Sequence, residues 1–318
     1  MSVSEHLRFF VASDLHGSDR CFRKVVRALE FYRADLAVIA GDLSPKDLVI
    51  VERKESGYRA RAASASAWSP LAEPLDVFRK RLADAGCLTV LTPDEASSFT
   101  GRETRRDWQH LFDHAFRKQL EQWQLFAEHE LGTDAVRLLW VPGNDDADWV
   151  DEQLGNPPFF NLDLRRFVVG HSLRFAGVGG SNPTPWNTPR EYVEQELAER
   201  LDRLFDLRSP DGLIAVTHIP PRASGLDMAP ALTSDLSYEM VLGQPVLKPV
   251  GSGAVRAMIE RVQPLLVVSG HVHEARGSTR IGRTVCINPG SLYHQGILFG
   301  CLIEIRDQKI TSVEFTEG

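Results

Sequence analysis

Five short apolar runs of this chain each end in polar side chains, and this pattern constrains the fold more than any other feature. The runs have the length and composition of buried strands, and they span residues 7–13, 35–40, 136–141, 213–217 and 265–269. Amphipathic helices are predicted among them at residues 20–31, 189–207 and 255–262. Buried strands that alternate with helices are typical of a mostly parallel sheet covered by helices. We therefore predict an α/β fold.

The polar residues that follow the five runs are of the kinds that bind divalent metal ions. In chain order they are Asp14 and His16, Asp42, Asn144, His218, and His271 with His273. Residues just past the carboxyl ends of parallel strands meet in one crevice. Imidazole, carboxylate and amide oxygen are suitable ligands for Mn, Fe or Zn. Each motif alone is ordinary, because a Gly-Asp pair usually forms a turn and a single histidine usually belongs to the core. The ordered set predicts a metal site.

A long segment, residues 45–134, interrupts the alternation between the second and the third run. We predict a short strand at 48–52, an irregular Ala/Ser-rich stretch at 59–70, and helices at 75–85 and 102–131. Both ends of the segment emerge beside predicted metal ligands. We therefore expect one domain with a mainly helical insertion that caps the crevice.

The second half of the chain adds strands that are expected to pair antiparallel. These are a hairpin of residues 167–170 and 173–178, and three closing runs at 284–288, 301–306 and 310–315. The start signal of the helix at 189–207 is Asn187-Thr188-Pro189, a cap followed by proline at the first helical position.

Composition and charge exclude several classes of protein. Hydrophobic residues make up 43% and charged residues 25% of the 318 residues, as in ordinary globular chains. The formal net charge is −7 and no long basic stretch is present, so a long nucleic acid is disfavoured as a partner. No apolar run approaches the ~18 residues of a membrane span, and the N-terminus lacks a signal-peptide pattern. The four cysteines form no metal or redox motif. We expect a cytoplasmic protein with no membrane partner, and its oligomeric state is left open.

The ordered motifs D-x-H, G-D, G-N-x-[DE], H and G-H-x-H resemble the signature of the calcineurin-like metallophosphoesterases. In this chain they are Asp14/His16, Gly41-Asp42, Gly143-Asn144-Asp145-Asp146, His218 and Gly270-His271-Val272-His273. The sequence looks like the small uncharacterised bacterial and archaeal branch, with a G-N-D-D variant of the third motif. The resemblance implies a four-layer α/β/β/α sandwich with two divalent metal ions, Mn, Fe or Zn. One ion would be held by Asp14, His16, Asp42 and His273, and the other by Asp42, Asn144, His218 and His271.

The resemblance also implies that phosphate esters are hydrolysed by a hydroxide held between the two metals, with Asp42 as the bridging ligand. Asp42, Asn144 and Asp145 are the residues it places in catalysis. At the position after Asn144 the family usually has a histidine that assists the leaving group, whereas this chain has Asp145. An ionised carboxylate cannot donate a proton and repels a phosphate dianion, unless burial or Asp146 raises its pKa. We therefore expect small phosphodiesters to be favoured over monoesters.

Two arginines are candidates for binding the substrate phosphate, because Arg222 and Arg276 follow His218 and His273 closely. Two alternative functions stay open. One is a phosphomonoesterase, including a phosphoprotein phosphatase, and the other is a non-catalytic interaction module stabilised by metal. The complete set of ligands argues against the module, because a scaffold has no need for both metal sites.

Overall fold

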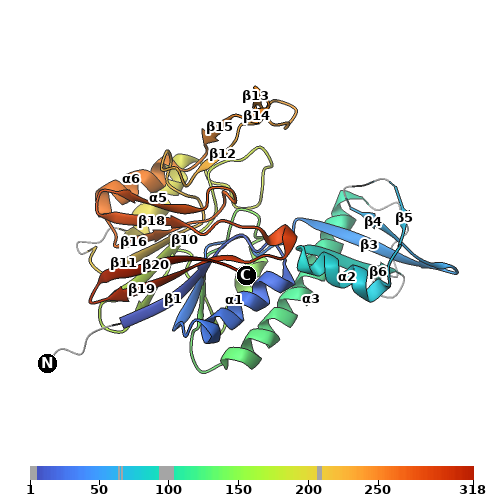
Figure 1. Cartoon of the computed structure of the whole chain (residues 1–318), viewed down its shortest axis with the longest axis horizontal. Helices are drawn as coiled ribbons and strands as arrows, with labels where there is room; N and C mark the ends of the chain where they lie inside the picture. The colour runs from blue at the N-terminus through green and yellow to red at the C-terminus, as the bar shows by residue number, and fades with distance from the viewer. Residues whose placement is uncertain (1–5, 64, 66, 93–103, 206–209) are drawn as a thin grey trace.

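Two six-stranded sheets form the centre of this computed structural model, which describes residues 6–63, 65, 67–92, 104–205 and 210–318 (Figure 1). The first sheet has the order β20-β19-β1-β2-β7-β8. Its strands are β1 (His6–Ala12), β2 (Leu36–Ile39), β7 (Leu138–Trp140), β8 (Phe159–Asn161), β19 (Phe299–Arg306) and β20 (Lys309–Glu317). The second sheet has the order β17-β18-β16-β11-β10-β9. Its strands are β9 (Arg166–Val169), β10 (Leu173–Val178), β11 (Leu213–Thr217), β16 (Leu266–Val268), β17 (Gly277–Ile281) and β18 (Thr284–Asn288).

The middle of each sheet is parallel and the edges are antiparallel. In the first sheet β1, β2, β7 and β8 run parallel, and β1 also pairs antiparallel with β19, so that His6 lies opposite Arg306 and Val11 opposite Cys301. In the second sheet β9 and β10 form the predicted hairpin. The three closing runs are strands as predicted, but they divide between the two sheets: β18 joins the second, and β19 and β20 join the first.

Apolar side chains fill the space between the two sheets and the outer face of each. Phe9 of the first sheet meets Phe175 of the second edge to face, with ring centroids 5.4 Å apart. On the outer face of the first sheet lie α1 (Asp19–Phe31) and α3 (Arg105–Leu131), and on that of the second lie α5 (Glu194–Phe205) and α6 (Gly253–Val262). Figure 1 shows the two pairs of helices on opposite sides of the sheets. The α/β fold class predicted from the alternating pattern is confirmed.

Helix α1 illustrates how the sequence sets this packing. Ser18 caps its N-terminus by accepting a hydrogen bond from the backbone N–H of Cys21. Phe22 and the apolar residues one turn apart from it face the sheet and are buried. The Phe22 ring also stacks on Trp123 of α3, with centroids 4.3 Å apart and planes inclined by 4°. Helices α1 and α3 are therefore joined in one apolar layer, and this layer covers strand β2.

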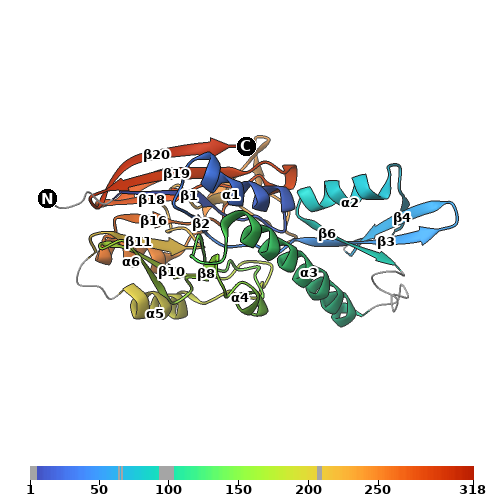
Figure 2. The same cartoon turned by 90° about the horizontal axis from the view of Figure 1, so that it is seen from below.

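Residues 45–92 form an arm that extends from the body of the molecule (Figures 1 and 2). It contains a four-stranded sheet of β5-β4-β3-β6 and one helix, with β3 (Asp47–Lys54), β4 (Gly57–Ala62), β5 (Ser69–Pro70), α2 (Leu75–Asp84) and β6 (Cys87–Thr92). The prediction of an irregular stretch at 59–70 is wrong at both ends, because β4 pairs antiparallel with β3 and β5 pairs antiparallel with β4. Arginine and alanine alternate along β4, and alanine gives only a weak apolar signal of period two.

Helix α3 links the arm to the body. Its buried residues Phe116, Leu120 and Trp123 belong to the same core as α1, although the sequence assigns them to the insertion. The helical prediction at 102–131 holds from Arg105 onwards, and residues 102 and 103 lie outside the described residues. The domain boundaries at 45 and 134 stay a prediction.

The helix predicted at 189–207 begins later than expected. In the structure α5 starts at Glu194, and residues 206 and 207 lie outside the described part of the chain. The Thr188 hydroxyl, expected to cap the helix, instead donates to Glu191 Oε1 over 2.7 Å, which holds the preceding loop. None of the helices within the described ranges combines the length and the apolar character that crossing a membrane requires.

An excursion after β11 was not predicted. Residues 228–249 contain four short strands in two antiparallel pairs, β12 (Met228–Pro230) with β15 (Leu247–Pro249) and β13 (Met240–Val241) with β14 (Gln244–Pro245). The remaining elements are α4 (Trp149–Gln153) and the short helix η1 (Tyr293–Gln295). In Figure 1 the excursion projects from the body on the side of α5 and α6.

Candidate metal centre

The seven predicted ligands come together where strands of the two sheets end. Four follow strands of the first sheet and three follow strands of the second, in the order Asp14, His16, Asp42, Asn144, His218, His271 and His273. At Asp14, His16, Asp42 and His271 the backbone has φ between 41° and 64°. This left-handed conformation is uncommon for residues other than glycine, and it clusters at functional sites.

A first group of donor atoms consists of Asp14, His16 and His273. Their ligand atoms all lie within 4.8 Å of one another. His273 Nε2 is 3.5 Å from Asp14 Oδ1 and 3.2 Å from His16 Nε2. The Asp14 carboxylate also accepts the backbone N–H of His271 at 2.9 Å, which fixes its orientation.

A second group consists of Asp42, His218 and His271, again within 4.8 Å of one another. The amide oxygen of Asn144 joins it, 3.0 Å from His218 Nε2 and 2.8 Å from His271 Nδ1. Asp42 lies between the two groups, because its Oδ2 is 3.5 Å from His16 Nε2 and 3.3 Å from His218 Nε2.

The donor set fits a cation. His218 Nδ1 lies 2.7 Å from the carbonyl oxygen of Ala40, so Nδ1 carries a hydrogen and donates a hydrogen bond to that oxygen. In neutral His218, Nε2 then carries a lone pair that faces the oxygens of Asn144 and Asp42. Burial would lower the pKa of His218, but the Asp42 carboxylate raises it to about 10. The site attracts positive charge, which a divalent ion held by these three acceptors would supply.

Two further imidazoles, the buried His16 and the half-buried His271, are in the form that a metal requires. Burial lowers the pKa of His16 to about 3 and that of His271 to about 4. Both rings are therefore neutral near pH 7 and can offer a nitrogen lone pair. His16 Nδ1 lies 3.2 Å from the carbonyl oxygen of Ser44, which orients the ring.

Asp146, which sequence reasoning treated only as a neighbour of Asp145, holds the ligand loops together. Its buried carboxylate accepts the backbone N–H groups of Leu43 at 3.0 Å, Ser44 at 2.8 Å and Gly143 at 2.8 Å. It thus ties the loop after β2 to the loop after β7. A Cβ at Gly143 would lie 1.9 Å from Asp42 Oδ1, so only glycine allows this close approach.

Asp145 and Lys46 form an ion pair at the edge of the centre. The backbone N–H of Asp145 donates to Asp42 Oδ1 at 2.9 Å. Burial and the nearby Asp42 charge raise the pKa of Asp145 to about 7, although Lys46 lowers it. Asp145 is therefore only partly ionised at neutral pH, and the lysine beside it, which sequence reasoning missed, offsets its charge.

A cavity of about 1030 Å³ opens above the centre and is lined by five of the residues predicted to bind metal or to act in catalysis, Asp42, Asn144, Asp145, His271 and His273. Asp14, His16 and His218 lie beneath its floor and are fully buried. Lys46 and Tyr293 also line it, and the Tyr293 ring lies 4.7 Å from that of His16. Among the described residues of the insertion only Lys46 lines the cavity, so the cap stays a prediction.

The two candidate arginines have different surroundings. Arg222 lines the cavity. Arg276 does not: its guanidinium donates to the Thr316 carbonyl at 2.8 Å and lies 4.2 Å from the centroid of the Phe299 ring. The structure does not bring Arg276 to this cavity, because contacts with the C-terminal strands hold its side chain elsewhere.

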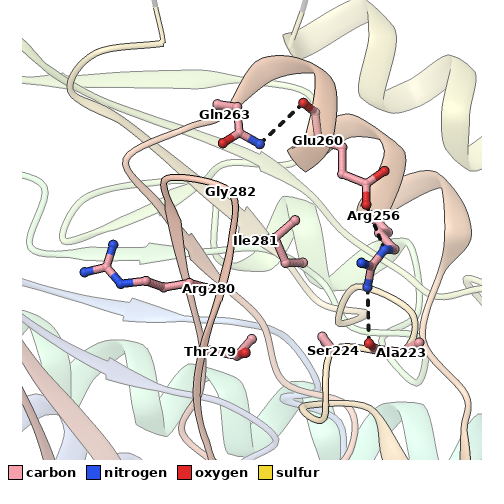
Figure 3. A pocket seen from close by; sticks show the side chains of 9 residues that line it. All are labelled: Ala223, Ser224, Arg256, Glu260, Gln263, Thr279, Arg280, Ile281 and Gly282. Atoms are coloured by element: carbon pink, nitrogen blue, oxygen red, sulfur yellow. Dashed lines mark hydrogen bonds and ion pairs between the residues drawn. The ribbon is translucent and has the colours of Figure 1, made fainter.

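A second hollow, of about 350 Å³, lies beside α6 (Figure 3). Its main charged groups are already paired. Arg256 donates to Glu260 at 2.9 Å and to the carbonyl oxygen of Ala223 at 3.1 Å. This hollow lacks the convergent acceptors of the metal centre.

The two facing sheets, with the predicted ligands at their strand ends, form a fold that proteins of known structure share. A solved structure that aligns with 98% of this chain and 99% of its own superposes with a TM-score of 0.58 at 14% identity. The structure of TT1561 from Thermus thermophilus covers the same shares, with a TM-score of 0.54 at 16% identity. These likenesses concern the fold alone.

One relative is similar in sequence. The uncharacterized protein MJ1162 of Methanocaldococcus jannaschii is 32% identical over 160 residues, which are 49% of this chain and 65% of the relative. The match thus spans slightly less than two thirds of that protein. No family model matches the chain.

Proposed function

We propose that this protein is a dinuclear-metal-dependent phosphoesterase that hydrolyses small phosphate esters, with diesters favoured over monoesters. The position of Asp42 carries this proposal. Its carboxylate lies within 3.5 Å of one imidazole of each ligand group, as a ligand shared by two ions requires. Asp14, His16 and His273 would hold one ion beside it, and Asn144, His218 and His271 the other.

Two bound divalent ions, such as Mn, Fe or Zn, would neutralise the phosphoryl oxygens and provide an activated water for in-line attack. The chain itself supplies the rest. Asn144 adds an uncharged ligand oxygen, which leaves more positive charge for the substrate. Lys46 and Arg222 line the cavity and can donate hydrogen bonds to phosphate oxygens. His16 and His218 stay oriented through backbone carbonyls.

The preference for diesters follows from charge and proton supply. A diester carries one negative charge and a monoester carries up to two near neutral pH, so the ionised fraction of Asp145 repels a monoester more. The Lys46 ammonium is held next to Asp145 and reduces this repulsion. Because no imidazole stands after Asn144, a poor leaving group departs with little assistance.

The alternatives differ in what they require of the site. A phosphomonoesterase or phosphoprotein phosphatase must bind a phosphate dianion next to Asp145. The Lys46 ammonium, which is paired with Asp145, offsets the carboxylate charge and would permit this. A metal-stabilised interaction module would need the ligands but not the cavity above them.

A substrate screen tests the proposal. The full chain, reconstituted with Mn²⁺, should hydrolyse aryl phosphodiesters with a higher kcat/KM than aryl monoesters or cyclic nucleotides. Parallel reactions with the metal-free protein control for contaminating hydrolases. A metal-loaded protein that turns over none of the three classes would favour the interaction module, and one that prefers monoesters would favour the phosphatase.

Arg222 and Arg276 provide a matched pair of substitutions. Arg222→Ala should raise the KM for an aryl diester about tenfold, because one charge-assisted hydrogen bond to the phosphate is lost. Arg276→Ala should leave KM within twofold, since its guanidinium is bound at the C-terminal strands. Steady-state kinetics with metal analysis of both variants checks this. Equal changes in KM would contradict the assignment of Arg222.

A further inference from the structure

The cavity wall away from the metal centre is apolar and exposed. Trp186, Leu236 and Tyr238 line the same cavity as the ligands Asp42 and His271. These three side chains are exposed to solvent by 62%, 50% and 60%. Exposed apolar groups that surround a concave site are typical of a ligand-binding wall.

The segment that carries Trp186 is tied to the metal centre. The side-chain amide of Asn144 donates to the Thr188 hydroxyl at 2.9 Å. Thr188 in turn donates to Glu191, and Glu191 accepts the backbone N–H of Thr184 at 3.0 Å. The backbone N–H of Trp186 donates to the Thr184 hydroxyl at 3.2 Å. The position of Trp186 is therefore set relative to a predicted metal ligand.

The other two side chains belong to the excursion, which has its own backbone support. The Glu239 N–H donates to the Ala231 carbonyl at 2.8 Å, and the Ala231 N–H donates to the Val246 carbonyl at 2.7 Å. These bonds hold the turn that carries Leu236 and Tyr238 over the cavity.

The size and charge of the cavity indicate what fills it. Ligand pockets usually measure about 300–1000 Å³, and this cavity is at the upper end, far larger than one phosphate needs. Lys46 and Arg222 lie on its wall together with the metal ligands, which suits the anionic end of a substrate. The wall formed by Trp186, Leu236 and Tyr238 suits an uncharged, apolar end.

We propose that the substrate is a phosphodiester with a large apolar or aromatic substituent, which packs against Trp186, Leu236 and Tyr238 while its phosphate lies at the metal centre. This inference rests on the proposed phosphoesterase function. It assigns selectivity to the excursion and to the loop with Trp186. Two aromatic rings favour an aromatic group, since contacts between aromatic rings add stabilisation to the burial of apolar area.

Two substrates that share the same leaving group and the same single negative charge separate the contribution of the apolar wall from the reactivity of the phosphate. Phenyl 4-nitrophenyl phosphate and methyl 4-nitrophenyl phosphate differ only in the arm that stays on the phosphorus. The ratio of their kcat/KM values, measured with the Mn²⁺-reconstituted full chain, should fall about tenfold in Trp186→Ala and in Tyr238→Ala. The intrinsic difference in reactivity is the same in every variant, so it cancels from this comparison.

Leu242→Ala is the control. Leu242 lies in the same excursion and is fully exposed, but it does not line the cavity, so the ratio should stay as in the wild type. Thermal unfolding of each variant separates lost selectivity from lost folding. Unchanged ratios in both aromatic variants would overturn the inference and would point instead to a macromolecule as the group that covers this wall.

Calorimetric binding of phenyl phosphate and of inorganic phosphate gives a readout without turnover. The wild type should bind phenyl phosphate about tenfold more tightly, and the two aromatic substitutions should remove most of this difference. If the wild type hydrolyses neither diester but keeps this difference in binding, the proposed hydrolysis fails and the assignment of the wall stands. If the substitutions leave the binding difference intact, the wall does not recognise the substituent.

Discussion

Asp42→Asn should abolish tight binding of both metal ions and nearly all phosphodiester turnover. The substitution removes the one negative charge that both ligand groups share and leaves His16 and His218 facing a neutral amide. Loss of one partner from a buried charged contact costs about 3–5 kcal/mol, so we expect metal affinity to fall by about 10²- to 10⁴-fold. Elemental analysis after reconstitution should give about two equivalents of metal for the wild type and close to none for the variant.

Asp76→Asn is a suitable control for this experiment. It makes the same chemical change at an exposed position in the first turn of α2, far along the arm from the ligands. It should retain both equivalents of metal and full activity. Two equivalents of metal in Asp42→Asn would show that the carboxylate is not the shared ligand.

Asp145→His should raise turnover of esters with poor leaving groups by up to about 10²-fold. An imidazole at this position can donate a proton to the departing oxygen, and a positioned acid commonly contributes 10²–10⁴-fold. The wild type should therefore show a steep dependence of rate on the pKa of the leaving group, which the substitution flattens. Monoester turnover should also rise, because the partly ionised carboxylate is gone. A series of aryl diesters and monoesters, assayed with metal content measured in parallel, checks both expectations.

Asp145→Asn separates the effect of losing the carboxylate charge from the effect of gaining a proton donor. It removes the negative charge without adding an acid, so monoester turnover should rise while the dependence on the leaving group stays steep. Lys46, which is paired with Asp145 in the wild type, remains present in both variants. Equal dependence in wild type and Asp145→His, or a wild type that prefers alkyl monoesters, would show that Asp145 does not impose this limit.

The meeting of the seven predicted ligands could be foreseen from sequence because each follows a buried strand within a few residues. Strand β11 at Leu213–Thr217, for example, agrees with the predicted run at both ends, and His218 follows it immediately. Parallel pairing then brings such residues to one edge of a sheet whatever the loops do. Local patterns are thus sufficient to predict the fold class and to predict that these seven side chains come together.

Features that depend on distant segments could not be predicted in this way. Arg222 and Arg276 occupy similar positions after a histidine, and only the packing of Arg276 on Phe299 of the C-terminal strands distinguishes them. Likewise, the ion pair of Lys46 with Asp145 joins residues 99 positions apart. The excursion that carries Leu236 and Tyr238 has strands of two or three residues, which are too short to show a period.

The pairing of β1 with β19 has a consequence for the synthesis of the protein. Strand β1 is made nearly three hundred residues before its partner on one side, Phe299–Arg306. At about 5–20 residues per second, that edge of β1 stays open for tens of seconds. An open apolar strand can pair with other nascent chains, so chaperone binding during translation should matter most for this strand.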